Sequence, residues 1–320
     1  MTAQDLIPNT PKRGFFSRIV RKFDAWEAKV PEQEVPRSGV VDWVGAIPFI
    51  GMHLTCLFVF VVGFSWVALA TALVAYAVRM FGITAFYHRY FSHRTFKTSR
   101  PFQFIGALLG AISVQRGPLW WAAHHRLHHR HSDDEKDVHS PKQYGFLWSH
   151  MGWILDRVNV RTRKEMIPDF MKFPELRFLD RFDLVAPIGF AVGMFLFGVA
   201  LEAFAPGLGT NGWQMLVWGF FVSTVFLYHG TFTINSLAHV FGSRRFETKD
   251  TSRNNFWLAL ITLGEGWHNN HHHCPATVRQ GFRWYEIDVS YYVLKGLSFF
   301  GIVWDLRPIP SRIRKQMKGS

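Results

Sequence analysis

The sequence predicts an all-α integral membrane protein with four transmembrane helices and a helical cap that carries clustered histidines. Two observations on composition support this fold class. Hydrophobic residues make up 48% of the 320-residue chain, and charged residues only 18%. Residues 43–78 contain no Asp, Glu, Lys or Arg, and residues 184–243 contain one charged residue, Glu202. Because a membrane span needs about 20 apolar residues, each block is long enough for two spans, and a soluble or disordered chain is excluded.

The two apolar blocks divide into four predicted spans. Gly63 and Ser65 mark a turn in the first block, and a Pro/Gly-rich segment, residues 205–212, marks one in the second. The predicted spans are residues 43–62, 66–87, 184–204 and 213–235. Residues 43–320 are therefore expected to form one membrane domain, preceded by an N-terminal segment, residues 1–42.

The distribution of Lys and Arg predicts how the chain is oriented. Residues 1–42 contain seven of the 36, residues 88–181 contain 16 and residues 236–320 contain 12, whereas the two turns contain none. Because cytoplasmic loops carry the Lys/Arg excess, we expect both termini in the cytoplasm. From the short N-terminal segment without an organelle signal, we also expect the membrane to be a bacterial inner (plasma) membrane. The net charge of +13 then faces anionic membrane lipid and does not indicate nucleic-acid binding.

Two shorter apolar segments are predicted to lie at the membrane surface. Residues 102–114 are apolar but too short to cross, so we expect a helix that lies at or dips into the interface. The N-terminal segment is typical of an amphipathic interfacial helix. Its apolar face is formed by Phe16, Ile19, Val20, Phe23 and Trp26.

Sixteen histidines are concentrated at the ends of the apolar segments. Residues three and four apart share one face of a helix, and neutral imidazole binds Fe, Cu, Zn and Ni. Three groups and one further histidine follow this pattern: His88 and His93; His125, His128 and His129; His268, His271 and His272; and His239, four residues after Asn235. His88 and His93 are about 140° apart on a regular helix, so they either lie where the span ends or bind different metals.

The predicted topology places all three groups on one side of the membrane, as a shared metal site requires. His124 and His273 extend two of the groups and are candidates for hydrogen bonding to ligands rather than for metal binding. The roles of His139 and Cys274 stay open, and we expect no disulfide. No group includes His53, His131, His150 or His229.

The boxes HxxxxH, HxxHH and HxxHH, with Asn235 and His239 between the last two, resemble those of integral-membrane fatty acid desaturases. The likeness runs from about residue 43 to residue 307 and is closest to the acyl-CoA Δ9, or stearoyl-CoA, desaturases. At His124, acyl-CoA desaturases of animals commonly have Asp. The resemblance implies that Asn235 contacts a di-iron cluster through a water molecule. It implies nine iron ligands: His88, His93, His125, His128, His129, His239, His268, His271 and His272.

This resemblance implies an O₂-dependent desaturase that introduces a cis double bond, at Δ9, into a saturated acyl chain. We expect the acyl chain to be attached to CoA, and attachment to a membrane lipid is the alternative that the sequence leaves open. No side chain can oxidise an unactivated methylene group, and Zn²⁺ has no redox chemistry, which favours iron. The sequence shows no CxxC or haem-binding segment, so we expect an external electron donor, ferredoxin-like or cytochrome b5-like, that docks on the basic face.

A tunnel for the acyl chain is expected along the second span. Tyr76 and Ala72 precede His88 by 12 and 16 residues, which places them about 18 and 24 Å deeper along a helix. They are expected to limit the length of the acyl chain, or else to be ordinary helix-packing residues.

Two other functions compete with desaturation. A membrane hydroxylase or alkane-type monooxygenase has similar histidine boxes and inserts oxygen after the same first hydrogen abstraction. A membrane metal transporter would need ionisable residues along a path through the spans, where the sequence offers His53, His229 and Glu202. Because the candidate ligands cluster outside the spans, the transporter is disfavoured.

Overall fold

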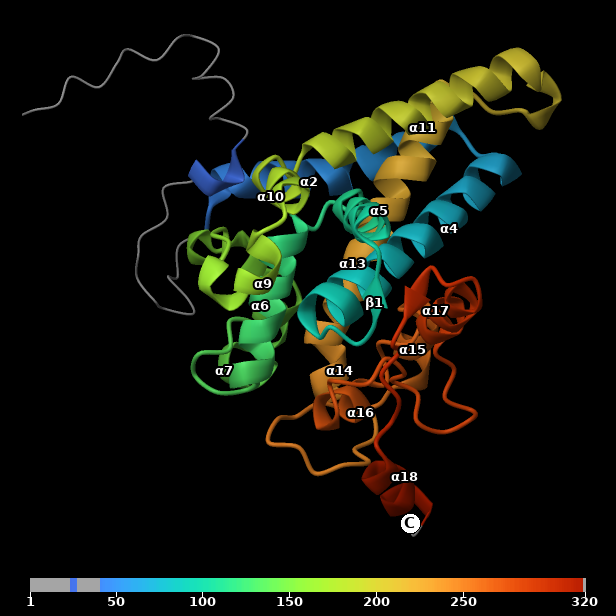
Figure 1. The fold of residues 1–320 in the computed structure, drawn as a ribbon. Coiled ribbons are helices and arrows are strands. Elements are labelled where there is room, and N and C mark those ends of the chain that lie inside the picture. Colours follow the sequence, from blue (N-terminus) through green and yellow to red (C-terminus); the bar gives the residue numbers. More distant parts are fainter. Residues whose placement is uncertain (1–23, 28–40, 319–320) are drawn as a thin grey trace, which may run out of the picture.

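The computed structural model describes residues 24–27 and 41–318, which are mostly helical, with a single pair of short strands among them (Figure 1). Strands β1 (Lys97–Thr98) and β2 (Val303–Trp304) pair antiparallel, with Lys97 opposite Trp304. The amphipathic helix predicted near the N-terminus falls largely outside the described residues. Its described part is one turn of 3-10 helix, η1 (Ala25–Glu27).

Four helical segments are long and apolar enough to cross a membrane, as predicted. Each is built from one or more consecutive elements. The first contains α2 (Trp43–Thr55), η2 (Cys56–Phe58) and α3 (Val59–Val62); the second α4 (Trp66–Phe81) and η3 (Gly82–Ser92); the third α11 (Val185–Phe204); and the fourth α12 (Gly212–Met215), η8 (Leu216–Val222), α13 (Ser223–Asn235) and α14 (Leu237–Val240).

The second and fourth spans are five residues longer at their C-terminal ends than predicted. They end at Ser92 and Val240 rather than at residues 87 and 235, and each contains a π-helical segment, η3 or η8. His88 and His239 consequently lie in the last turns of these two spans. Since both are even-numbered spans of one chain, the two histidines lie on the same side of the membrane.

In the spans, small residues face the neighbouring helices and large apolar residues face outward. In α4, Ala68 and Ala72 are buried, whereas Leu73 and Val74 are about 60% exposed. This is the reverse of a soluble helix and is the pattern expected where the outer face contacts lipid.

One buried charge in the second span was not identified from the sequence. Arg79 is fully buried in α4, and its guanidinium donates to the hydroxyls of Ser223 and Thr224 and to the carbonyl oxygens of Ala75 and Ile112. These acceptors replace the carboxylate that a buried Arg commonly requires.

The helix predicted over residues 102–114 is α5 (Arg100–Ala111), so it begins two residues earlier and ends three residues earlier than expected. It packs on η3, and two glycines permit the close approach. A Cβ at Gly106 would lie 1.9 Å from the Phe86 ring, and one at Gly110 would lie 2.1 Å from the Tyr87 ring.

The remaining elements precede, connect or follow the spans, and two of them, α6 and α16, lie together with α14 at the end of the fourth span (Figure 1). They are α6 (Pro118–His131), α7 (Pro141–Tyr144), α8 (Phe146–His150), η4 (Gly152–Leu155), η5 (Arg157–Asn159), η6 (Lys164–Met166), α9 (Pro168–Met171), α10 (Pro174–Arg181), η7 (Pro206–Leu208, between the third and fourth spans), α15 (Phe256–Ile261), α16 (His268–His273), α17 (Val289–Phe299) and α18 (Ser311–Lys318).

Candidate metal centre

All nine histidines singled out from the sequence converge on two adjacent groups. Within each group, one ring nitrogen of every member lies within 4.8 Å of those of the others. The five-histidine group consists of His88, His93, His125, His129 and His271, and the four-histidine group of His128, His239, His268 and His272. Each group therefore combines residues that are more than 100 positions apart in the chain.

The π-helical turn of η3 brings His88 and His93 into the same group. On an α-helix these two side chains would point about 140° apart. In η3 the hydrogen bonds run from residue i+5 to residue i, and the backbone N–H of His93 donates to the carbonyl oxygen of His88 at 3.2 Å. Residues five apart then return to nearly the same face, so the two histidines lie in one group rather than in two.

The imidazoles of each group face one another through their Nε2 atoms. Nε2 of His271 lies 3.0 Å from Nε2 of His88 and 2.9 Å from Nε2 of His129. In the four-histidine group, Nε2 of His239 lies 3.1 Å from Nε2 of His268. Several lone-pair nitrogens directed at one small space form a nitrogen-rich site of the kind that transition metals prefer.

Four of the nine imidazoles have a carboxylate against their Nδ1 atom, on the side away from the group. The pairs are His128 with Asp137 at 3.0 Å, His272 with Asp250 at 2.8 Å, His239 with Asp133 at 3.5 Å, and His88 with Glu265. An Nδ1–H that donates to a carboxylate leaves the lone pair on Nε2 and makes the imidazole a stronger ligand. Sequence reasoning assigned no role to these acids, although Asp133, Asp137 and Glu265 each lie within eight residues of a histidine box.

The protonation states also suit metal binding. Burial is the main cause that lowers the pKa of His125, His129 and His271 well below the ordinary value, and neighbouring imidazoles lower it further. Burial likewise lowers the pKa of His272 to about 4, although Asp250 opposes this shift. These imidazoles are therefore neutral at pH 7, the form in which they bind metals.

The carboxylates behind the four-histidine group remain charged although they are largely buried. Burial acts to raise the pKa of Asp250, but hydrogen bonds from His272 and Ser252 outweigh it and hold that pKa below its ordinary value. The pKa of Asp137 is lowered in the same way by His128. The site therefore carries buried negative charge directly behind its ligands.

The residues present fit a pair of iron ions. His272 illustrates this: its Nδ1 is satisfied by Asp250, whereas its buried Nε2 has no hydrogen-bond partner among the described residues. Asp137 and His139 come close to His128 and form a third, overlapping group. Since His128 already belongs to the four-histidine group, this third group overlaps it at that residue.

The residues left open by the sequence lie around the two groups. His124 and His139 are buried, and His124 Nε2 and His139 Nδ1 have no hydrogen-bond partner among the described residues. His273 stacks on Phe246, and Cys274 packs in the same small apolar cluster, so neither belongs to a metal group.

Three other histidines form a separate row outside the metal groups. Nε2 of His229 lies 3.1 Å from Nε2 of His53, and its Nδ1 lies 3.0 Å from Nε2 of His150. The row links the first span to α8. It was not expected from the sequence, because the three residues share no local spacing.

A cavity of about 900 Å³ adjoins the five-histidine group. His125 and Asn235 line it, together with the aromatic residues Trp120, Trp121 and Trp153. The volume lies at the upper end of the range of about 300–1,000 Å³ that is usual for ligand sites. The cavity therefore gives an extended apolar ligand access to one side of the metal centre.

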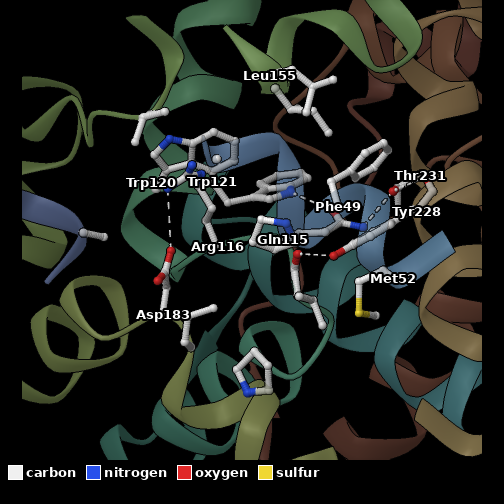
Figure 2. Close-up of a pocket in the computed structure, with 18 of the residues that line it drawn as sticks. Phe49, Met52, Gln115, Arg116, Trp120, Trp121, Leu155, Asp183, Tyr228 and Thr231 are labelled. Carbon is white, nitrogen blue, oxygen red and sulfur yellow. Dashed lines mark hydrogen bonds and ion pairs between the residues drawn. The ribbon is translucent and has the colours of Figure 1, made fainter. Parts of the chain in front are cut away.

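A polar cluster lies among the residues that line the cavity. The side-chain amide of Gln115 donates to Thr231 Oγ1 at 2.7 Å and accepts from Trp121 Nε1 at 3.4 Å. The Tyr228 hydroxyl donates to the carbonyl oxygen of Val114 at 2.9 Å. Figure 2 shows Tyr228 and Thr231 on one side of the cavity and Trp120 and Asp183 on the other.

The expected tunnel residues do not line this cavity. Ala72 is buried in the packing of α4, and the Tyr76 hydroxyl donates to the carbonyl oxygen of Ile261 at 2.6 Å. The cavity is instead lined by residues of α2, α11 and the fourth span. The second reading offered for them, ordinary helix packing, describes their surroundings.

Comparison with known proteins agrees with this geometry. The profile of the fatty acid desaturase family matches residues 64–295. The chain is 35% identical over 274 residues to a protein named sn-1 stearoyl-lipid 9-desaturase from Anabaena variabilis, covering 83% of this chain and 94% of the relative. It is 35% identical over 279 residues to Delta-9 acyl-lipid desaturase 1 of Arabidopsis thaliana, with 86% of each chain covered.

A relative with a different named substrate is equally similar. The chain is 37% identical over 270 residues to an acyl-CoA 5-desaturase of Anemone leveillei, covering 83% of this chain and 79% of the relative. The named carriers and double-bond positions therefore differ among relatives of similar identity. With a profile match over most of the chain, four apolar helices and histidine groups compatible with a metal site, the protein is a member of the fatty acid desaturase family of membrane oxidoreductases.

Proposed function

We propose that the protein introduces a cis double bond near the ninth carbon of a saturated acyl chain, using O₂, an external electron donor and two irons. The overall reaction takes two hydrogens from adjacent methylene groups and combines O₂, two electrons and two protons with them to give two water molecules. The single observation that carries this proposal is the cavity that runs to His125, because it offers an apolar chain a path to the metal groups.

The nine histidines are proposed as the iron ligands, five for one ion and four for the other. The ions, when bound, supply the oxidising power from O₂ that a methylene group requires. The outer carboxylates Asp133, Asp137, Asp250 and Glu265 hold four imidazoles in the tautomer that presents Nε2. Asn235 lines the cavity beside His125 and is proposed to reach the centre through a water molecule.

The chain's other contribution is to hold one pair of carbons against the centre. Gln115, Thr231 and Trp121 all line the cavity and are joined by hydrogen bonds, and we propose that they form a fixed constriction in it. An acyl chain that bends there presents the same carbons in every turnover. We propose that this constriction selects the double-bond position, near Δ9.

The orientation and the electron supply follow from charge. The Lys/Arg excess on one side predicts that both termini and the histidine groups face the cytoplasm of a bacterial inner membrane. A soluble, acidic donor such as a ferredoxin-like or cytochrome b5-like protein then approaches the basic face directly.

Fatty acid analysis of cells that express the chain tests the proposal. Gas chromatography–mass spectrometry, with derivatisation of the double bond, is expected to show new 9-unsaturated C16 and C18 acids, absent when His128→Ala replaces the wild type. A hydroxylated product would instead favour the hydroxylase or alkane-type monooxygenase. No new product, with iron bound and electrons supplied, would contradict the proposal.

A further inference from the structure

The cavity extends from the metal centre into a slot between two membrane spans. One wall of the slot is formed by a single face of α11, and the opposite wall is formed by a stretch of α2 that includes two glycines and a proline. The lining residues are Leu184, Pro187, Ile188, Ala191 and Val192 of α11 and its N-terminal edge, and Gly45, Pro48, Phe49, Gly51 and Met52 of α2. The slot therefore runs along the spans rather than ending in the cap.

Two of the lining side chains on α11 are more than half exposed. Ile188 is 56% exposed and Val192 52% exposed, and both line the cavity. Exposure of this size along a cavity wall indicates that the cavity is open at this edge. Both helices are candidate membrane spans, so this edge faces lipid acyl chains rather than water.

The small residues of α2 keep the opposite edge of the slot wide. A Cβ added at Gly51 would meet nothing within 4 Å, so there is open space beside this residue of the cavity wall. Pro48 lies inside the same helix one turn earlier. An alkyl chain, which is thin and flexible, can pass such an edge without rearrangement of the spans.

The polar end of the cavity is not suited to a phosphate-rich carrier. Among the described residues that line it, Arg116 is the one Lys or Arg, and it lies 3.7 Å from Asp183. Asp24 also lines the cavity and pairs with Arg181, while Asp42 adds a further carboxylate. CoA carries several negatively charged phosphate groups. At this end of the cavity they would lie near carboxylates, and the described lining residues provide no unpaired Lys or Arg to bind them.

We propose that the acyl chain enters sideways from the bilayer, through the slot between α2 and α11, while still esterified to a membrane glycerolipid. The inference rests on the proposed desaturase function and adds to it the substrate class and the route. The glycerol backbone stays at the level of the membrane surface, near Asp183, two residues before the start of α11. The chain then reaches the centre without leaving an apolar environment.

The substrate class is tested with the wild-type, iron-loaded protein in nanodiscs, supplied with O₂ and a reduced ferredoxin. One sample contains a 1-stearoyl phosphatidylglycerol bilayer, and the other contains an unreactive bilayer with added stearoyl-CoA. We expect the lipid-bound chain to be desaturated at least about tenfold faster. Faster turnover of stearoyl-CoA would overturn the inference but leave the desaturase function standing, whereas no desaturation of either substrate would remove the function itself.

The route is tested with two matched substitutions. Gly51→Phe places a ring in the slot, and Gly193→Phe places one on α11 outside the cavity, where an added Cβ also meets nothing within 4 Å. We expect Gly51→Phe to lower turnover of the lipid-bound chain about tenfold or more and Gly193→Phe to change it less than about twofold. Iron content and thermal unfolding confirm that both variants fold, and equal turnover of the two variants would exclude this route.

Discussion

The two histidine groups differ in what lies behind their imidazoles. In the five-histidine group one imidazole, His88, has a carboxylate partner, Glu265, which is shared with Arg89. In the four-histidine group three imidazoles have one, contributed by Asp133, Asp137 and Asp250. Yet the cavity reaches a member of the five-histidine group, His125, and its lining includes no member of the other.

This difference indicates that the two metal positions are stabilised by different means. The four-histidine position compensates for fewer ligands with negative charge close behind them, which strengthens each imidazole as a donor. The five-histidine position has more ligands and less negative charge behind them, and it lies where an apolar substrate has access. We therefore expect the two positions to respond differently to substitution.

The largest effect is expected from removing a ligand from either group. His93→Ala in the five-histidine group and His272→Ala in the four-histidine group should each lower desaturation by about a thousandfold or more, because both ions are needed for one reaction. Iron content is expected to fall from two to about one per chain in each variant. A variant that retains two irons and its activity would show that the residue is not a ligand.

The outer carboxylates are expected to have a smaller effect, and mainly on one position. Asp250→Asn removes the charge behind His272 and should weaken iron binding at the four-histidine position about 10- to 100-fold. Iron titration measured by absorbance and by mass spectrometry checks this. Glu175→Gln, in the exposed ion pair with Arg100, is the matched control, and equal iron affinity of the two variants would contradict the role assigned to Asp250.

The constriction is expected to affect selectivity more than rate. Thr231→Val keeps the shape of the side chain but removes the acceptor for Gln115, whose hydrogen bond is worth about 1 kcal/mol. The ratio of 9-unsaturated to other isomers should therefore fall about fivefold. Thr233→Val is the control, because Thr233 bonds to the carbonyl oxygen of Gly230 and does not line the cavity; an unchanged isomer ratio in Thr231→Val would remove the constriction from the proposal.

The smallest expected effect concerns stability at the polar end of the cavity. Burial raises the pKa of Asp183 to about 6, and Arg116 opposes this shift. Because the folded state holds this proton more tightly than the unfolded chain, its contribution to stability is present below about pH 4 and is lost as the pH rises through 6. Asp183→Asn, which stays neutral, should therefore raise the melting temperature at pH 7.5 by about 2 °C relative to wild type.

The pH profile provides the check on Asp183. The difference in melting temperature between Asp183→Asn and wild type should shrink towards pH 4, where the wild-type carboxyl is protonated. Asp305→Asn is a suitable control, because Asp305 is exposed and pairs with Lys97. A difference that does not change with pH would show that the Asp183 carboxyl is not held at a raised pKa.

The sequence alone was sufficient to predict most of the membrane layout. The four spans were predicted from the uncharged apolar runs. Within lipid, a run of that length can form all of its backbone hydrogen bonds internally only as a helix. The ends of the second and fourth spans were placed five residues too early, since His88 and His239 end the apolar pattern but not the helix. Arg79 was overlooked as a buried charge for a related reason: its acceptors, Ser223 and Thr224, come from another span.

The histidines of the two groups could be singled out from the sequence because the spacing of residues on a helix is a local property and the number of membrane crossings can be counted. The spacing of His125, His128 and His129 defines one face of α6, and an even number of crossings places the boxes on one side. The pairing of His88 with His93 was left open, because a π-helical turn cannot be read from a pattern that assumes 3.6 residues per turn.

The walls of the cavity, by contrast, depended entirely on tertiary packing. The sequence could place Tyr76 at a suitable depth, but only the packed structure shows that its hydroxyl bonds to Ile261 and that the cavity lies against α2 and α11. Depth along a helix follows from residue number, whereas the side of the helix that borders an empty space depends on every neighbouring element. For the same reason, the sequence determined which residues are able to bind metal, and the tertiary structure decided how they divide into two groups and which carboxylates stand behind them.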